Sequence, residues 1–162
     1  MANGSFGYTA FDNDVYARRI VGWACAATMG TEELPLQALE QAIAWAASHG
    51  GTQGLVHHSD HGVQYISTVY TTRVKEYGML PSTGTVGDSY DNAMAESVNG
   101  AYKTELVWRR KPFADLNDLE LATFRWVSWW NSKRLHQSLG YRTPKQTETG
   151  YYANQAAQAA SL

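Results

Sequence analysis

The chain has 162 residues, of which 44% are hydrophobic and 17% charged, so it is globular and long enough for one domain with a substantial core. A single cysteine, Cys25, excludes an intramolecular disulfide and fits a reducing compartment. The sequence has neither a signal peptide nor an apolar run that could span a bilayer. We therefore expect a cytoplasmic protein with no membrane partner.

The charge is unevenly distributed. The formal net charge is −2, but residues 1–102 carry a net −6 and residues 103–145 a net +5. A phosphate-handling protein could use such an asymmetry. A solvated, charged helix face explains it equally well, so charge alone leaves both readings open.

The first half of the chain predicts a hairpin, a helix and a strand. Residues 6–15 and 19–26 alternate loosely and are rich in aromatic and β-branched side chains, which predicts a β-hairpin. Apolar residues at helical spacing follow, with Thr31 as a plausible N-cap and Gly50 beyond the helix end. The segment "GLVHHSD" then predicts a short strand that ends at Asp60.

The second half predicts mainly helices. We expect a helix over about 67–77, a short strand at "MLPST", and then a glycine-rich loop, "GTVGDSYDN". Further helices are predicted over about 93–108, with Asp91 as N-cap, and over about 116–132. Alternating strands and helices indicate a mixed α/β sheet packed with helices.

Two carboxylates stand out as candidates for chemistry. Asp60 ends a predicted strand, Glu96 lies in the first turn of a predicted helix, and 35 residues separate them. Paired carboxylates at close range repel unless a cation lies between them, and hard ions such as Mg²⁺ or Mn²⁺ prefer oxygen ligands. We therefore expect Asp60 and Glu96 to bind such an ion together.

The residues around Asp60 suggest other chemistries that the pattern disfavours. Along a strand, His57 and His58 point to opposite faces, and packing with hydrogen bonding explains them better than a zinc site. Ser59 lacks the surroundings of a hydrolase nucleophile. His61 follows Asp60 directly and could touch a phosphate.

Several motifs resemble a known family. The segments "HHSDHGVQY", "VGDSYDNAMAESVNGAYKTEL", "WNSKRLHQSLGYRTP" and "DVYARRIVGW" resemble the catalytic core of bacterial insertion-sequence transposases related to retroviral integrases. The resemblance covers about residues 6–148 and leaves 149–162 as a tail that we expect to be loosely held. It implies a ribonuclease H-like fold whose Asp, Asp, Glu triad binds two divalent ions for in-line attack on a phosphodiester.

The resemblance also assigns residues to that site. Asp60 matches the second carboxylate of the triad and Glu96 the third, so both are expected to be catalytic metal ligands. Asn92 and Asn99 flank Glu96 on one helix face, where they either support the site or simply cap and pack the helix. Basic residues on the same helix or just beyond it are expected to contact DNA: Lys103, Arg109 and Arg110.

One expected part of the family pattern is missing. The first carboxylate of the triad belongs to a central strand ahead of the hairpin, and no matching segment precedes Phe6. Asp14 matches a different aspartate of the family, and Asp12 falls where the family usually has an apolar residue. We expect the second and fourth strands of the family fold to lack their shared neighbour. The chain would fill that gap by re-pairing its own strands or by borrowing a strand from another copy.

These observations predict a DNA transposase core that cleaves and joins phosphodiesters with metal ions but is impaired without the first carboxylate. A non-catalytic DNA-binding or assembly remnant of a transposase is the alternative. A metal-dependent nuclease of the same fold, without strand transfer, is a third. The expected partners are DNA and further copies of the chain, with no small-molecule cofactor.

Overall fold

The computed structural model describes most of the chain, with the backbone alone for residues 89–95. The described ranges are 1–2, 4–28, 33–59, 67–82, 89–110 and 112–161. The elements in chain order are β1 (Tyr8–Asn13), β2 (Ile20–Ala26), α1 (Glu33–Ala47), β3 (Val56–His58), α2 (Thr68–Glu76), β4 (Leu80–Ser82), α3 (Ser89–Tyr102), the π-helical turn η1 (Lys103–Val107), α4 (Leu116–Ser132), the 3₁₀ turn η2 (Gln137–Leu139) and α5 (Pro144–Ala160).

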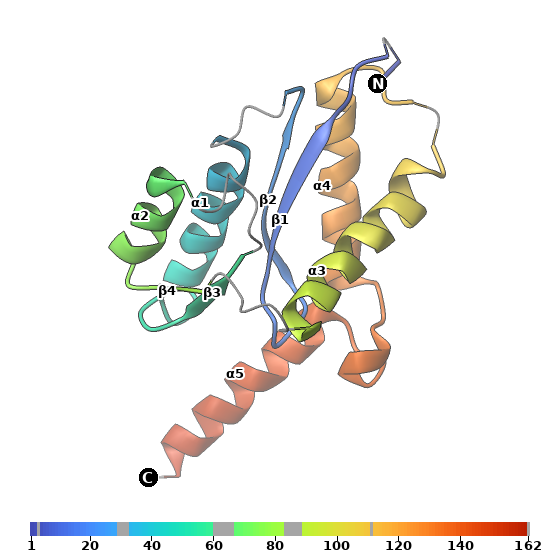
Figure 1. Ribbon diagram of the computed structural model, residues 1–162. Helices are drawn as coiled ribbons and strands as arrows, with labels where there is room; N and C mark the ends of the chain where they lie inside the picture. The colour runs from blue at the N-terminus through green and yellow to red at the C-terminus, as the bar shows by residue number, and fades with distance from the viewer. Residues whose placement is uncertain (3, 29–32, 60–66, 83–88, 111, 162) are drawn as a thin grey trace.

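The β1–β2 hairpin lies at the centre of the fold, with α1 on one side and α3 and α4 on the other (Figure 1). The two strands pair antiparallel, with Phe11 opposite Trp23, and a bulge follows Asp12, so the predicted hairpin is confirmed. Gly22 of β2 is required for close packing, because a Cβ there would collide with the carbonyl oxygen of Ala38 in α1. Helix α1 therefore rests directly on the strand backbone.

The two faces of the hairpin bury different kinds of side chain. Small residues face α1, where Ala10 and Ala24 pack on Ala38. Large residues fill the opposite face, against α3 and α4. Their cluster contains Ile20, Val98, Tyr102, Trp126, Val127 and Trp130. Trp126 and Trp130 of α4 are therefore core residues, and the helix predicted over about 116–132 matches α4.

The strands form two separate two-stranded sheets. Strand β3 pairs in parallel with β4, and β1 pairs only with β2 among the described residues. Neither sheet reaches the other, so β1 and β3 have no common neighbour within the described part of the chain. This agrees with the expected absence of a central strand, and re-pairing of the chain's own strands is not observed there.

Helix α3 begins earlier than the sequence predicts. It starts at Ser89, so Asp91 lies within the first turn, and the prediction of Asp91 as N-cap is wrong. Its regular part ends at Tyr102, where the chain widens into η1, and the Trp108 N–H donates to the Lys103 carbonyl at 2.8 Å. Thr31, the N-cap predicted for α1, lies outside the described residues.

The C-terminal segment is helical, because its start is well capped. The Thr143 side chain accepts from the Gln146 N–H, the Gln146 side chain accepts from the Thr143 N–H, and Pro144 occupies the first turn. Helix α5 continues through residue 148, the end of the predicted core, and the residues after Tyr152 are exposed. A loosely held tail beyond residue 148 stays a prediction.

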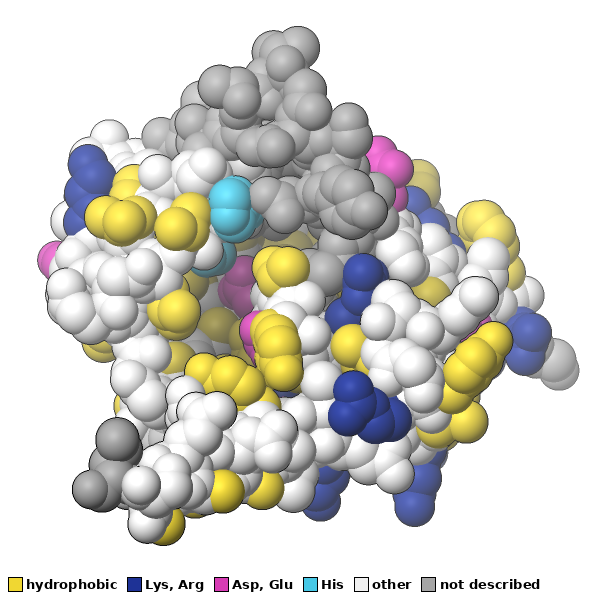
Figure 2. Space-filling view, turned by 90° about the horizontal axis from the view of Figure 1, so that it is seen from below, with side chains coloured by type: hydrophobic (Ala, Val, Ile, Leu, Met, Phe, Trp, Pro, Cys, Tyr) yellow, Lys and Arg dark blue, Asp and Glu magenta, His cyan; other side chains and the backbone are white. Residues whose placement is uncertain are grey.

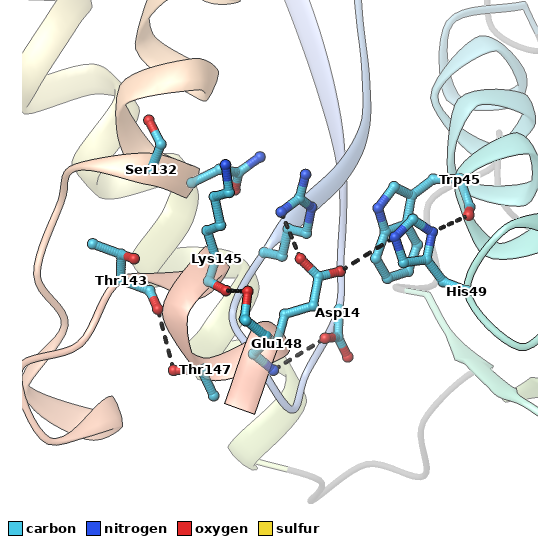
Figure 3. A network of polar contacts seen from close by, with 12 residues as sticks. Asp14, Trp45, His49, Ser132, Thr143, Lys145, Thr147 and Glu148 are labelled. Atoms are coloured by element: carbon cyan, nitrogen blue, oxygen red, sulfur yellow. Dashed lines mark hydrogen bonds and ion pairs between the residues drawn. The ribbon is translucent and has the colours of Figure 1, made fainter. Parts of the chain in front are cut away.

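The first turns of α5 are tied to the hairpin and to α1 by polar contacts. Glu148 forms an ion pair with Arg19 at 2.8 Å and approaches His49 Nε2 at 3.8 Å, as Figure 3 shows for Glu148 and His49. The Tyr152 hydroxyl donates to the His49 carbonyl at 2.9 Å. Although α5 extends away from the body (Figure 1), none of the helices in the described ranges is both long and apolar enough to cross a membrane.

We predict that Tyr102→Phe destabilises the protein by about 1–2 kcal/mol, because it removes a buried hydroxyl bonded to Thr123 Oγ1 at 2.6 Å. Urea unfolding followed by circular dichroism measures the change as a lower midpoint at constant slope. Tyr141→Phe is the control, since Tyr141 is 67% exposed. Equal midpoints for both variants would contradict a structural role for this hydroxyl.

Candidate active site

Helix α3 presents Glu96 to solvent because its opposite face is anchored in the core. Val98 and Tyr102 are buried against α4, and the Tyr102 hydroxyl is bonded to Thr123. The Phe11 ring of β1 meets the Tyr102 ring edge-on at 5.0 Å between centroids. These contacts fix the C-terminal half of α3, and the Glu96 side chain is exposed on the other face.

The exposed face of α3 carries three of the predicted residues. Glu96, Asn99 and Lys103 all have exposed side chains, and their spacing places them along one side of the helix. Asn92 lies one turn before Glu96, but its side chain is outside the described part of the structure. The structure therefore leaves Asn99 free to act near Glu96 and gives it no role in the core.

Arg109 and Arg110 lie away from Glu96. They follow η1, and at the rise of an α-helix the 13 positions from Glu96 to Arg109 correspond to roughly 20 Å. Both arginines line a separate groove against α4. From the sequence, these arginines are placed with Lys103 because all three are basic. The length of the helical segment between them and Glu96 puts them in a different place.

Asp60 lies outside the described residues, so its convergence with Glu96 stays a prediction. Pairing between β3 and β4 extends to the residue before it, since the Ser59 N–H donates to the Ser82 carbonyl at 3.1 Å. The end of the strand is therefore held at the point where the sequence places Asp60.

His57 is a packed, hydrogen-bonded side chain, as the sequence predicts. Its Nε2 lies 2.8 Å from the Tyr70 hydroxyl of α2, and burial lowers its pKa to about 4. The ring is therefore neutral near pH 7. The described residues contain no cluster of three or more His, Cys, Asp or Glu side chains that could hold a metal ion.

A hollow of about 610 Å³ lies between β1, α1 and β3. Figure 2 shows it with acidic side chains inside and histidine at its edge. Asp12 lines this hollow, its Oδ2 is buried without a hydrogen bond to any described residue, and burial raises the pKa of its carboxyl to about 7. From the sequence, Asp12 was considered only as a replacement for the missing metal ligand. Its position, where the family usually has an apolar strand residue, could have indicated a buried carboxyl.

Asp14 has a structural role in the turn between β1 and β2. Its two carboxylate oxygens accept from the N–H groups of Tyr16 and Ala17, each at 3.1 Å. Such an arrangement is a local turn cap. This agrees with the expectation that Asp14 is not a member of the catalytic triad.

The chain also matches known protein families. Residues 1–89 match an integrase core domain family, and residues 77–144 match a second family of the same description. The chain belongs to the integrase core domain family. The resemblance to insertion-sequence transposases related to retroviral integrases is thereby confirmed.

The relatives by sequence are transposases. The chain is 49% identical over 158 residues to the transposase named for insertion sequence element IS986/IS6110 of Mycobacterium tuberculosis, which covers 96% of this chain and 56% of that protein. It is 51% identical over 149 residues to the transposase for IS629 of Shigella sonnei, with 92% and 48% covered. This chain thus spans about half the length of these relatives.

A solved structure confirms the fold class. The catalytic core of HTLV-2 integrase, in a trimeric form with magnesium, superposes with a TM-score of 0.61 at 17% identity. The match covers 88% of this chain and 93% of that one. This places the protein in the ribonuclease H-like α/β class that the sequence predicts.

We predict that Asp12→Asn makes stability less dependent on pH. A folded-state pKa of about 7, against 3.8 for a free carboxyl, means that the parent loses stability as the pH rises from about 4 to about 7. The advantage of Asp12→Asn over the parent should grow across that range, by up to about 4 kcal/mol. Urea unfolding at several pH values measures it.

Glu96→Gln, at an exposed position, serves as the control and should show no comparable trend. A constant difference between Asp12→Asn and the parent from pH 4 to pH 8 would show that the Asp12 carboxyl does not titrate in the hollow.

Proposed function

We propose that this integrase core domain is the catalytic core of a DNA transposase, which cleaves and joins phosphodiester bonds with the help of divalent ions. The observation that carries the proposal is the exposed Glu96 on a core-anchored helix, inside the region that matches the family. Lys103, exposed on the same side of that helix, would bind the phosphate backbone next to it.

The carboxylates present suit a hard divalent ion. Glu96 is exposed and accessible to a hydrated ion, and Asp60 follows a strand end that is held by pairing with β4. Mg²⁺ or Mn²⁺ bound by these two side chains would neutralise the charge that develops on the attacked phosphate. Asn99, and Asn92 one turn earlier, would orient the Glu96 carboxylate by hydrogen bonds.

A third carboxylate is expected in the complete two-metal site. The gap between β1 and β3 is the place where a further strand would bring it, because among the described residues β1 pairs only with β2 and β3 only with β4. Asp14 is engaged in its turn, and Asp12 lies in a buried position with a raised pKa, so neither is proposed as the missing ligand. We therefore propose that the chain alone cleaves DNA poorly.

This proposal is tested with a chimera in which the present chain replaces the matched region of the Mycobacterium tuberculosis transposase. Nicking and joining of a labelled duplex with Mn²⁺ should be weak for the chain alone and clear for the chimera. Glu96→Gln in the chimera should reduce the rate by about 100-fold or more, because it removes a metal ligand. Asp60→Asn should have an equally large effect.

Glu76→Gln, an equal change of charge on α2, is the matched control and should retain activity. A chimera that binds DNA but neither nicks nor joins it would favour the alternative, a non-catalytic assembly remnant, which the gap between β1 and β3 already makes plausible. A chimera that nicks without joining would indicate a nuclease.

We also propose that the chain forms homo-oligomers in which another copy supplies a strand to the hollow between β1 and β3. Residues of β1 and β3 line this hollow, neither strand has a second neighbouring strand among the described residues, and Val56 is 52% exposed at its rim. Unpaired strand edges are templates for pairing with another chain. An added strand would also offer donors to the buried Asp12 carboxyl.

Light scattering at micromolar concentration should therefore give a mass above the 18.0 kDa of one chain. Val56→Asp should shift the protein toward monomers, because it places a charge where the added strand must pack. Val69→Asp on α2, at a valine that is 50% exposed, is the control and should not. A monomer at every concentration would contradict strand exchange between copies.

A further inference from the structure

A second groove lies between η1 and α4, away from Glu96. It has a volume of about 430 Å³ and an apolar floor that includes Leu106 and Ala122. Arg109 and Arg110 border it on one side, and Arg125 and Trp129 border it on the other. The groove is therefore open and apolar, and guanidinium groups border it from α4 and from the segment after η1.

The positive charge of this groove is largely uncompensated. Arg109 and Arg125 are exposed, and neither forms an ion pair with a described residue. Arg110 forms a long ion pair of 3.5 Å with Asp118, and its guanidinium lies over the Phe113 ring at 5.3 Å. The acidic side chain in the groove, Glu105, is neutralised by Arg134 at 2.7 Å and accepts from Trp126 Nε1 at 3.3 Å.

Exposed tryptophan adds a stacking surface to this charge. Trp129 borders the groove with 42% of its surface exposed, and Trp108, next to Arg109, is 71% exposed. Leaving large apolar rings in water is unfavourable without a partner to cover them. Exposed aromatic rings beside arginines are the arrangement that binds bases and phosphates of unpaired strands.

We propose that the groove between η1 and α4 binds single-stranded DNA, with an unpaired base stacked on Trp129 and the adjoining phosphates held by Arg109 and Arg125. The inference rests on the proposed function, since it names the form of DNA bound at a second place on the same protein. A second copy of the chain is a poor occupant, because a two-fold contact at this surface would set arginines against arginines.

The groove would act at a distance from the reacting phosphate. Since roughly 20 Å separate Glu96 from Arg109 along α3 and η1, a strand held in the groove is not the segment that reacts. An unpaired strand that leaves the duplex near Glu96 would be captured there. The groove would thus keep the separated strand away from the site while Lys103 holds the duplex.

The test is fluorescence anisotropy with a labelled 20-nucleotide oligothymidylate and with a labelled duplex of equal length. Trp129→Ala should weaken binding of the single strand by about 10-fold and affect the duplex much less, since only an unpaired base can stack. Arg109→Ala combined with Arg125→Ala should weaken binding and lower the salt dependence by about 1.4 in slope. Thermal unfolding checks that each variant is folded.

Lys75→Ala on α2 is the control for lost charge and should bind the single strand as the parent does. An inactive chimera whose groove variants still lose single-strand binding would contradict the proposed activity and leave this inference standing. A chimera that cleaves DNA, together with groove variants that bind the single strand as the parent does, would contradict this inference and leave the proposed activity standing.

Two other results would overturn the assignment. A poly-glutamate peptide of matched charge that displaces the oligonucleotide as well as unlabelled DNA does would identify the groove as a site for acidic protein segments. A fall in mass by light scattering on Trp129→Ala, with DNA binding unaltered, would identify it as a contact between copies.

Discussion

The hydrogen bond between Tyr102 and Thr123 is the contact on which the candidate site depends. It joins α3 to α4 inside the aromatic core at 2.6 Å, and Thr123 also donates to the Leu119 carbonyl at 2.8 Å. Since Tyr102 and Val98 face inward, the helical period turns Glu96 outward. Helix α3, which carries the candidate residue Glu96, is therefore held by its C-terminal half.

The second constraint is the gap between the two small sheets. Close contact between Gly22 and Ala38 fixes α1 on the hairpin, and the hydrogen bond of His57 to Tyr70 fixes β3 on α2. Each of the two units is thus held together by its own contacts, but no strand joins them in the described part of the chain. The buried Asp12 carboxyl faces the hollow that this leaves. Burial in this hollow raises the pKa of the carboxyl to about 7.

Sequence patterns predicted the elements that are fixed by local signals. Helix α4 was predicted at its observed bounds, because Asp115 caps it and its apolar residues follow the helical period. The start of α3 was missed because the sequence offers two aspartates of the cap type, Asp88 and Asp91, and the prediction chose the later one. The prediction that Glu96 lies on this helix is confirmed, but its placement in the first turn is wrong, since α3 begins at Ser89. Its role as a metal ligand stays a prediction. The family resemblance could not separate Arg109 from the site, since that separation results from the length of the helix.

The distribution of ion pairs explains how a protein with a net charge of −2 can present unpaired basic residues in two places. Arg19 forms an ion pair with Glu148, and Arg134 forms one with Glu105. These arginines stabilise the fold, and because their charge is neutralised they do not attract a distant anion. Lys103, Arg109 and Arg125 make no ion pair with a described residue and are exposed. Attraction of DNA depends on these unpaired charges, because paired ones cancel within a Debye length. The chain thus presents Lys103 beside Glu96 and a separate basic groove about 20 Å along the helix, and we propose that each contacts a different segment of DNA.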